Sequence, residues 1–280
     1  MAIFLALMSS AVWGTSDFIG GLISRRLPTY LVVVTSQTAG LVAVTVSALV
    51  TGGFGEPLGW VVPAVVAGAS LAVGLLMFYT ALATGPMGIV SPITALAVLV
   101  PMSFGLARGD SLSVVTSIGI VVALAGAVCA SGPELRGSAH ARPIVLAVLS
   151  AALFGVAMLF LAQGAKADPV MSLWGMRAVS VAGLAGGLLF VADRRALFQV
   201  SVRRRDVSLI VLAGLGDSGA NLLFQLASLR GYLSVVSVLA SLYPAMTVLL
   251  ARVVLQQRLR RGQLLGVLAT LGGVALVSAG

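Results

Sequence analysis

Residues 214–225 read GLGDSGANLLFQ, and this stretch places a carboxylate inside a long apolar run. At 3.6 residues per turn, Asp217, Asn221, Gln225 and Ser228 fall at i, i+4, i+8 and i+11, so they share one face of a helix. A charge near the centre of a bilayer costs from a few kcal/mol to roughly 10 kcal/mol or more, so it normally faces a bundle interior or a water-filled cavity. The stretch therefore predicts a membrane helix whose polar face lines a cavity.

The rest of the composition is that of an integral membrane protein. Of the 280 residues, 59% are hydrophobic and 9% are charged, and the mean hydropathy is +1.12. An ordinary soluble domain has about 25% charged residues. The net charge of +9 comes from short arginine clusters between apolar runs, where anionic lipid headgroups are the expected neighbours. We expect no nucleic-acid partner, because the chain has no basic domain of the required kind.

The chain contains few of the residues that form metal sites, disulfides or cofactor sites. Cys129 is the only cysteine and lies in an apolar run, so it has no partner for a disulfide within the chain. His140 is the only histidine and lies in a polar connector. We therefore expect neither a metal nor a cofactor. The N-terminus lacks a basic region and a convincing cleavage site, which predicts a retained first span and no signal peptide.

Apolar runs long enough to cross a bilayer, about 20 residues each, can be counted along the sequence. Most of them are separated by short connectors that contain glycine, proline or charged residues, which begin or end helices. We predict an all-α integral membrane protein with ten transmembrane helices. The expected spans are 3–24, 29–51, 60–82, 87–107, 112–131, 143–163, 169–192, 206–228, 233–255 and 262–279.

The two halves of the chain resemble each other. Residues 5–14 align with residues 146–155 at an offset of 141, and Gly119 aligns with Gly266 at an offset of 147. Each half has an odd number of spans, so the second copy enters the membrane from the opposite side, with the substrate site expected between the repeats. We predict two inverted five-helix repeats around a central cavity. The first is 1–132, a connector follows at 133–142, and the second is 143–280.

The distribution of basic residues predicts the orientation. The first connector and every second one after it carry twelve arginines, and the remaining connectors carry Arg108, Lys166 and Arg230. The positive-inside rule places the arginine-rich, odd-numbered connectors in the cytoplasm and both termini outside. We expect a multi-pass protein of the cell membrane, that is, the inner or plasma membrane. The twelve are Arg25, Arg26, Arg136, Arg142, Arg194, Arg195, Arg203, Arg204, Arg205, Arg258, Arg260 and Arg261.

Three ionisable side chains lie well inside predicted spans: Asp17, Arg177 and Asp217. Trp13 and Ser16 share a helical face with Asp17, which gives a second polar stripe. Either aspartate can carry a proton, and Arg177 can be a counter-ion or an anchor for a substrate carboxylate. Structural alternatives stay open, because Asp17 can form an ordinary ion pair with an arginine and Arg177 can extend its charge to the membrane surface.

Aromatic and proline residues are weaker indicators of a functional site than the ionisable residues. Tyr79 and Tyr243 are candidates for lining a substrate cavity, although aromatic residues in membrane helices more often serve packing. Pro92 and Pro101 lie in the fourth predicted span and Pro244 lies in the ninth. Each removes a backbone donor, so we expect kinks in these two helices.

Short motifs connect the chain with a known family. The stretches are WGTSDF at 13–18, SLYP at 241–244, LLA at 249–251, LQQRL at 255–259 and QLLG at 263–266. Together they resemble the EamA-type branch of the drug/metabolite transporter superfamily over essentially the whole chain. The resemblance implies ten helices in two inverted halves, a central cavity formed by the first four helices of each half, and transport of small metabolites.

One feature departs from this family pattern. The family usually has Gly-Glu before the last helix of each half, whereas this chain has Gly109-Asp110 in the first half and Gln256-Gln257 in the second. An acidic residue beside Arg258 is therefore missing. The sequence therefore leaves open whether the second half forms any ion pair that the family has in this loop.

The sequence predicts a secondary active transporter, not an enzyme. We expect export of a small amphipathic metabolite, an amino-acid-like compound or a drug-like amine, by alternating access with protons as a coupling ion. No phosphate-binding loop is present, which argues against ATP-driven transport by this chain. Three alternatives remain at this point: a flippase for a lipid-linked precursor, a membrane scaffold, and an intramembrane aspartyl protease, whose Gly-x-Gly-Asp motif matches residues 214–217.

Overall fold

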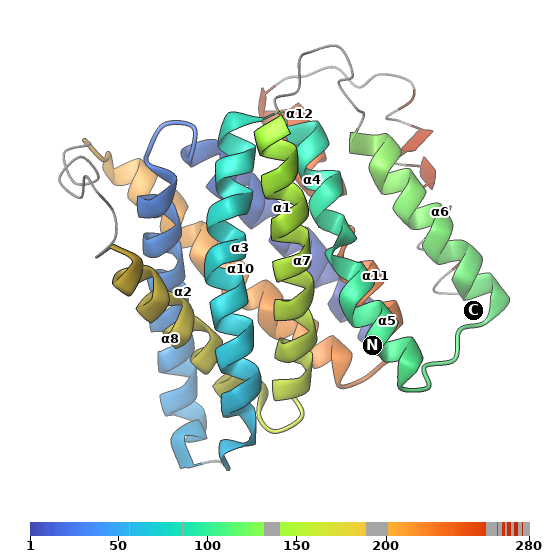
Figure 1. Cartoon of the computed structure of the whole chain (residues 1–280), viewed down its shortest axis with the longest axis horizontal. Helices are drawn as coiled ribbons and strands as arrows, with labels where there is room; N and C mark the ends of the chain where they lie inside the picture. The colour runs from blue at the N-terminus through green and yellow to red at the C-terminus, as the bar shows by residue number, and fades with distance from the viewer. Residues whose placement is uncertain are drawn as a thin grey trace.

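The structure is a computed structural model that describes residues 1–131 except 56 and 86, residues 141–188 and residues 201–255. It also describes positions 262, 265, 266, 268, 269, 272, 273 and 276. All elements in this part of the chain are helices (Figure 1). The all-helical fold class is therefore confirmed for the described residues. The tenth expected span, 262–279, lies largely outside them, so the count of ten helices stays a prediction.

Helices of the first half begin and end close to the expected positions. Glycine and proline mark several of the boundaries: Pro28 precedes the second helix, and Gly52 ends it with a φ of 71°, a backbone conformation that glycine adopts without strain. The helices are α1 (Ala2–Ile23), α2 (Thr29–Thr51), α3 (Val61–Thr84), α4 (Met87–Ala95), α5 (Leu99–Ala107) and α6 (Val114–Ser131), with short 3₁₀ turns η1 (Gly53–Gly55), η2 (Leu58–Trp60) and η3 (Leu96–Val98).

The described helices after residue 140 include one with a side-chain cap. Asp168 caps the second of them, since its carboxylate accepts a hydrogen bond from the Met171 amide at 2.5 Å and Pro169 occupies the first helical position. The helices are α7 (Ala141–Gly164), α8 (Pro169–Gly187), α10 (Arg204–Ser228), α11 (Leu233–Ala240) and α12 (Tyr243–Leu255).

The two spans expected to kink at proline are interrupted instead. The fourth span passes through η3, and the ninth stops at Ala240 and restarts at Tyr243. Proline clashes with the carbonyl four residues earlier, which is Ala97 for Pro101 and Ala240 for Pro244. Both prolines therefore lie in the first turn of a new helix, where no backbone donor is needed. Pro92 lies inside α4, so it causes no such break.

Within the part of the chain that the structure describes, five helices are long and apolar enough to cross a membrane: Ala2–Ile23, Thr29–Thr51, Leu58–Thr84, Arg142–Gly164 and Arg204–Ser228. Further apolar helical segments are shorter, which agrees with the breaks in the fourth and ninth spans. This composition and length indicate a multi-pass membrane protein.

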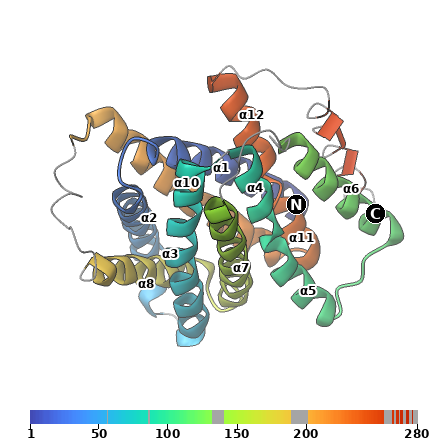
Figure 2. The same ribbon diagram turned by 45° about the horizontal axis from the view of Figure 1, so that its top comes forward.

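Helices from the two halves pack against each other around the middle of the molecule. The main pairings are α1 with α10 and α3 with α7, followed by α3 with α8 and α2 with α10. Both views place α2 and α8 at one end of the bundle and α6 at the opposite end (Figures 1 and 2). The centre is therefore formed by α1, α3, α7 and α10.

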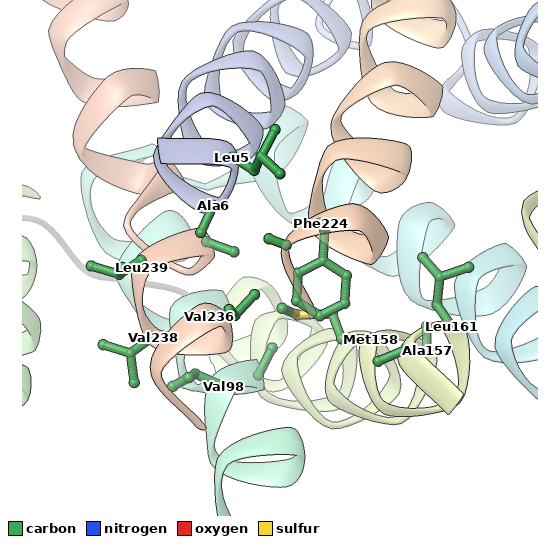
Figure 3. Close-up of a cluster of buried hydrophobic side chains, with 14 of the residues drawn as sticks. Leu5, Ala6, Val98, Ala157, Met158, Leu161, Phe224, Val236, Val238 and Leu239 are labelled. Carbon is green, nitrogen blue, oxygen red and sulfur yellow. The ribbon is translucent and has the colours of Figure 1, made fainter. Parts of the chain in front are cut away.

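The largest buried apolar cluster lies on one side of this centre. The ring of Phe224 from α10 is fully buried among Met158 and Leu161 of α7, with Leu5 and Ala6 of α1 across from it (Figure 3). In a membrane such packing holds helices together by close contact, because lipid chains are as apolar as leucine. A close-packed apolar layer therefore holds α1, α7 and α10 together.

Candidate functional site

Arg177 forms the ion pair at the centre of the site. The side chain is fully buried in α8, and its Nη2 lies 2.7 Å from Oδ2 of Asp217 on α10. Its Nη1 donates a hydrogen bond of 2.6 Å to Oε1 of Gln37 on α2, which also accepts one from Ser180 at 3.2 Å. The alternative in which Arg177 reaches the membrane surface is therefore wrong. Its buried charge is compensated by a carboxylate, as burial requires.

The other oxygen of Asp217 connects α10 to α1. Oδ1 accepts a hydrogen bond from Nε1 of Trp13 at 3.0 Å and another from Nδ2 of Asn221 at 3.1 Å. Asn221 also donates to the backbone carbonyl of Asp217 at 2.7 Å. Asp217 is thus a fixed anion with three side-chain partners, drawn from three helices of the two halves.

Among the residues that the structure describes, Asp17 differs from Asp217 in having no side-chain partner. It is buried on α1, yet within the described chain its carboxylate forms neither a hydrogen bond nor an ion pair. The alternative in which Asp17 simply pairs with an arginine is therefore wrong for this part of the molecule. A buried carboxylate without a partner is costly unless it faces water, a proton or a bound cation.

Asp17 and Asp217 line the same central cavity. Its volume is about 50 Å³, enough for a few water molecules but far below the roughly 300 Å³ of a typical small-molecule site. Six structural elements, η3 among them, contribute to its wall. The lining residues are Trp13, Asp17, Leu71, Ala97, Phe154, Ala157, Met158, Asp217, Asn221 and Tyr243.

The predicted site residues separate into two groups. Trp13, Asp17, Asp217, Asn221 and Tyr243 line the cavity, while Arg177 lies behind Asp217. The remaining three are buried elsewhere. These are Ser16, whose hydroxyl packs against Gly216, Tyr79, whose ring packs against Gly20, and Gln225.

Several residues of the site were not expected from the sequence. Gln37, the amide that holds Arg177, was detectable as a lone amide within an apolar run. The apolar wall formed by Leu71, Phe154 and Met158 had no such signal, because every face of an apolar run looks alike in a sequence. Tyr243 is positioned by donating a hydrogen bond of 2.8 Å to Thr94, a contact between the two broken helices.

The charges of the site do not cancel. Two aspartates and one arginine leave one excess negative charge in a low-dielectric environment, where a cation or a proton at Asp17 is favoured. Over the residues that the structure describes, no group of three or more potential metal ligands occurs. The excess negative charge between apolar and aromatic walls can bind a proton or an organic cation.

A loop near the end of the first half has a structural role. Asp110 accepts hydrogen bonds from the backbone amide of Ser234 at 3.0 Å and from its hydroxyl at 2.8 Å, at the start of α11. Gly109, with a φ of 99°, makes the turn that brings Asp110 there. The corresponding loop of the second half, Gln256-Gln257, lies outside the described residues.

Together, the apolar helices and the charged cavity at their centre define a multi-pass membrane protein with an internal polar site. The model of the EamA-like transporter family matches residues 1–132 and 141–279. The chain belongs to this family, which is part of the drug/metabolite transporter superfamily. The resemblance found in the sequence motifs is therefore confirmed.

Comparison with solved structures supports the fold. A chain described only as the crystal structure of a protein is similar to this one, with a TM-score of 0.78 and 19% identity over 99% of this chain and 96% of that chain. At this identity the similarity concerns the fold alone. A search of curated proteins finds no match.

Proposed function

We propose that the protein is a secondary active transporter, an exporter, of a small amphipathic amine or amino-acid-like compound. The observation that carries this proposal is the carboxylate of Asp17 in an apolar-walled cavity, where it has no partner among the described residues. Protons are the coupling ion, and Asp17 binds either a proton or the cationic group of the substrate. Asp217 is held by Arg177 and acts as a fixed part of the site.

Matched hydrogen bonds support the inverted repeat on which alternating access rests. Ser9 donates to the carbonyl of Ala220 at 2.8 Å, and Ser150 donates to the carbonyl of Gly74 at 3.0 Å. The two serines differ by 141 positions and the two carbonyls by 146, in line with the offsets between the halves. Each bond joins the first helix of one half to the third helix of the other.

Two pairs of glycines follow the same relation. A Cβ at Gly14 would clash with the carbonyl of Tyr243, and a Cβ at Gly155 would clash with the carbonyl of Ala97. These contacts bring the first helix of each half against the broken helix of the other. Equivalent close contacts, between the third helix of one half and the second of the other, involve the pairs Gly68 with Met176 and Gly214 with Ser36.

The cavity favours a particular class of substrate. Trp13, Phe154 and Tyr243 provide aromatic surface, and Leu71 and Met158 provide aliphatic surface. Aromatic rings also attract cations through their electron-rich faces. A compound with an amino group and an apolar body matches these walls together with the excess negative charge. Since the present cavity is smaller than such a compound, transport requires the halves to separate.

The alternatives fit the site less well. An aspartyl protease needs two carboxylates that share a proton, whereas both oxygens of Asp217 are engaged by Arg177, Trp13 and Asn221. A scaffold has no use for the unpartnered Asp17. A lipid-linked precursor flippase remains compatible with the fold, and the transport experiment below distinguishes it.

Transport by purified protein in liposomes tests the proposal. We expect an imposed proton gradient to drive a subset of hydrophobic amines and amino acids, and we expect carboxylates without an amino group to stay in place. Liposomes without protein are the control. If no member of such a panel moves while fluorescent lipid analogues exchange between leaflets, the flippase is correct and the proposal is wrong.

A further inference from the structure

A second, larger cavity opens at one end of the bundle and is referred to here as the outer pocket. Its volume is about 380 Å³, within the range of small-molecule sites. It lies where the ends of α5, α7 and α10 meet the start of α11, on the face expected to be outside the cell. The lining residues are Phe104, Gly105, Arg108, Asp110, Ala162, Gln163, Lys166, Ser228, Gly231, Tyr232 and Leu233.

The outer pocket lies along the same two helices as the central cavity. On α7, Met158 lines the central cavity and Ala162, one turn further, lines the outer pocket. On α10, Asn221 lines the central cavity and Ser228, two turns further, lines the outer pocket. The two spaces are therefore separated by only one or two turns of helix.

Gln225 lies on α10 between Asn221 of the central cavity and Ser228 of the outer pocket. Its side chain is fully buried, and among the described residues neither its amide nitrogen nor its amide oxygen has a hydrogen-bond partner. A buried amide without hydrogen bonds costs about 1–3 kcal/mol, so its presence there needs a reason. Phe224, the preceding residue, and Leu161 of α7 are also fully buried and belong to the apolar cluster (Figure 3). If the space between the two cavities opens, the amide of Gln225 can form hydrogen bonds with water or with a passing substrate.

The charges of the outer pocket are opposite to those of the central cavity. Arg108 and Lys166 line it, and within the described chain neither forms an ion pair. Asp110 also lines it, but its carboxylate is engaged by both the amide and the hydroxyl of Ser234. The pocket therefore favours a negatively charged group, whereas the central cavity favours a positive one.

We propose that the outer pocket is a second binding site on the transport path, one that takes the carboxylate end of the substrate, with Gln225 in the gate between the two cavities. This inference rests on the proposed function and narrows the substrate class to compounds with both an amino and a carboxylate group. The experiments below measure the chemical modification of thiols and not transport. The proposed function and the proposed outer site can therefore be contradicted independently.

Charged thiol reagents test the pocket on the purified protein. With Cys129, the only cysteine, replaced by serine, Ser228→Cys places a thiol in the pocket. The rate of each reagent is divided by its rate with a free thiol in solution. On this scale we expect an anionic methanethiosulfonate to react with the thiol in the pocket faster than a cationic one. We expect Arg108→Gln with Lys166→Gln to reduce this preference about fivefold. Arg230→Gln removes a neighbouring charge outside the pocket and should leave the preference unchanged. An equal effect of Arg230→Gln, or no preference at all, would overturn the proposal.

The gate is tested by a thiol at Asn221→Cys in the same background. We expect it to react slowly, to prefer the cationic reagent because of Asp17, and to react at least several-fold faster when Gln225→Ala opens the layer. Leu215→Ala, an exposed position on the same helix, is the control and should have no effect. If Gln225→Ala leaves the rate unchanged, Gln225 is not in the gate.

Protection of the thiol against modification shows whether the anionic group that binds in the outer pocket belongs to a substrate or to a lipid. We expect leucine or phenylalanine to slow modification of Ser228→Cys, and we expect nanodiscs rich in phosphatidylglycerol to give no more protection than neutral nanodiscs. If the anionic lipid protects and the amino acids do not, the pocket is a lipid headgroup site and not part of the transport path.

Discussion

Arg177 and Asp217 depend on each other, because each would otherwise be a buried charge without a partner. Arg177→Gln should therefore lower stability by about 3–5 kcal/mol. The double variant Arg177→Gln with Asp217→Asn leaves no charge unpaired, so it should recover most of this loss. Thermal unfolding in detergent measures the loss of stability in the single variants and its recovery in the double variant. A double variant with the summed loss of the two single variants would mean that the pair contributes no specific coupling.

At the scale of single residues, the sequence indicates charges better than it indicates contacts. Asp17, Arg177 and Asp217 stood out because ionisable groups are costly in a membrane. Their different roles, a free carboxylate and a neutralised one, could not be predicted, because they depend on which helices meet. Gln225 shared a face with Asp217 and Asn221 as expected, but it lies beyond the central cavity, because a helical face extends past the length of one cavity.

At the scale of helices, two glycines set how closely the halves approach. Gly14 and Gly155 lie against backbone carbonyls of the opposite half. Gly14→Ala and Gly155→Ala should each destabilise the protein by about 1–3 kcal/mol, because a backbone cannot move aside as a side chain can. Thermal unfolding is again the measurement.

The control for these substitutions lies on α8. Among the described residues, no atom lies within 4 Å of a Cβ added at Gly183, so Gly183→Ala should be neutral or slightly stabilising. Equal losses at Gly14, Gly155 and Gly183 would contradict a role of close helix contact. They would point instead to a general sensitivity of helical glycines.

Helix positions were predictable because apolar runs of about 20 residues have few alternatives in a membrane. The interruptions of the fourth and ninth spans were predicted only as kinks. Whether a proline bends a helix or starts a new one depends on the neighbours that stabilise the ends. Here the ends lie against Gly14 and Gly155 of the other half, a contact that the sequence of one span does not contain.

At the scale of the whole molecule, the arginine distribution predicts which face lies in the cytoplasm. In the Cys129→Ser background, Lys166→Cys should react with an impermeant maleimide added to intact cells. Arg25→Cys, exposed in an odd-numbered connector, should react only after the cells are permeabilised. The reverse pattern would mean that the orientation is inverted and that the outer pocket faces the cytoplasm.

The central claim is that Asp17 carries the coupling proton or the substrate cation, while Asp217 is fixed by Arg177. Proton-driven transport in liposomes by wild type and Asp17→Asn tests it most directly, with correct folding checked by thermal unfolding. We predict that Asp17→Asn folds normally. It loses the proton dependence of transport if Asp17 carries the proton, and it loses transport itself if Asp17 binds the substrate cation, since an amide neither titrates nor carries a charge. A well-folded Asp17→Asn variant that still transports in proportion to the proton gradient would contradict the claim.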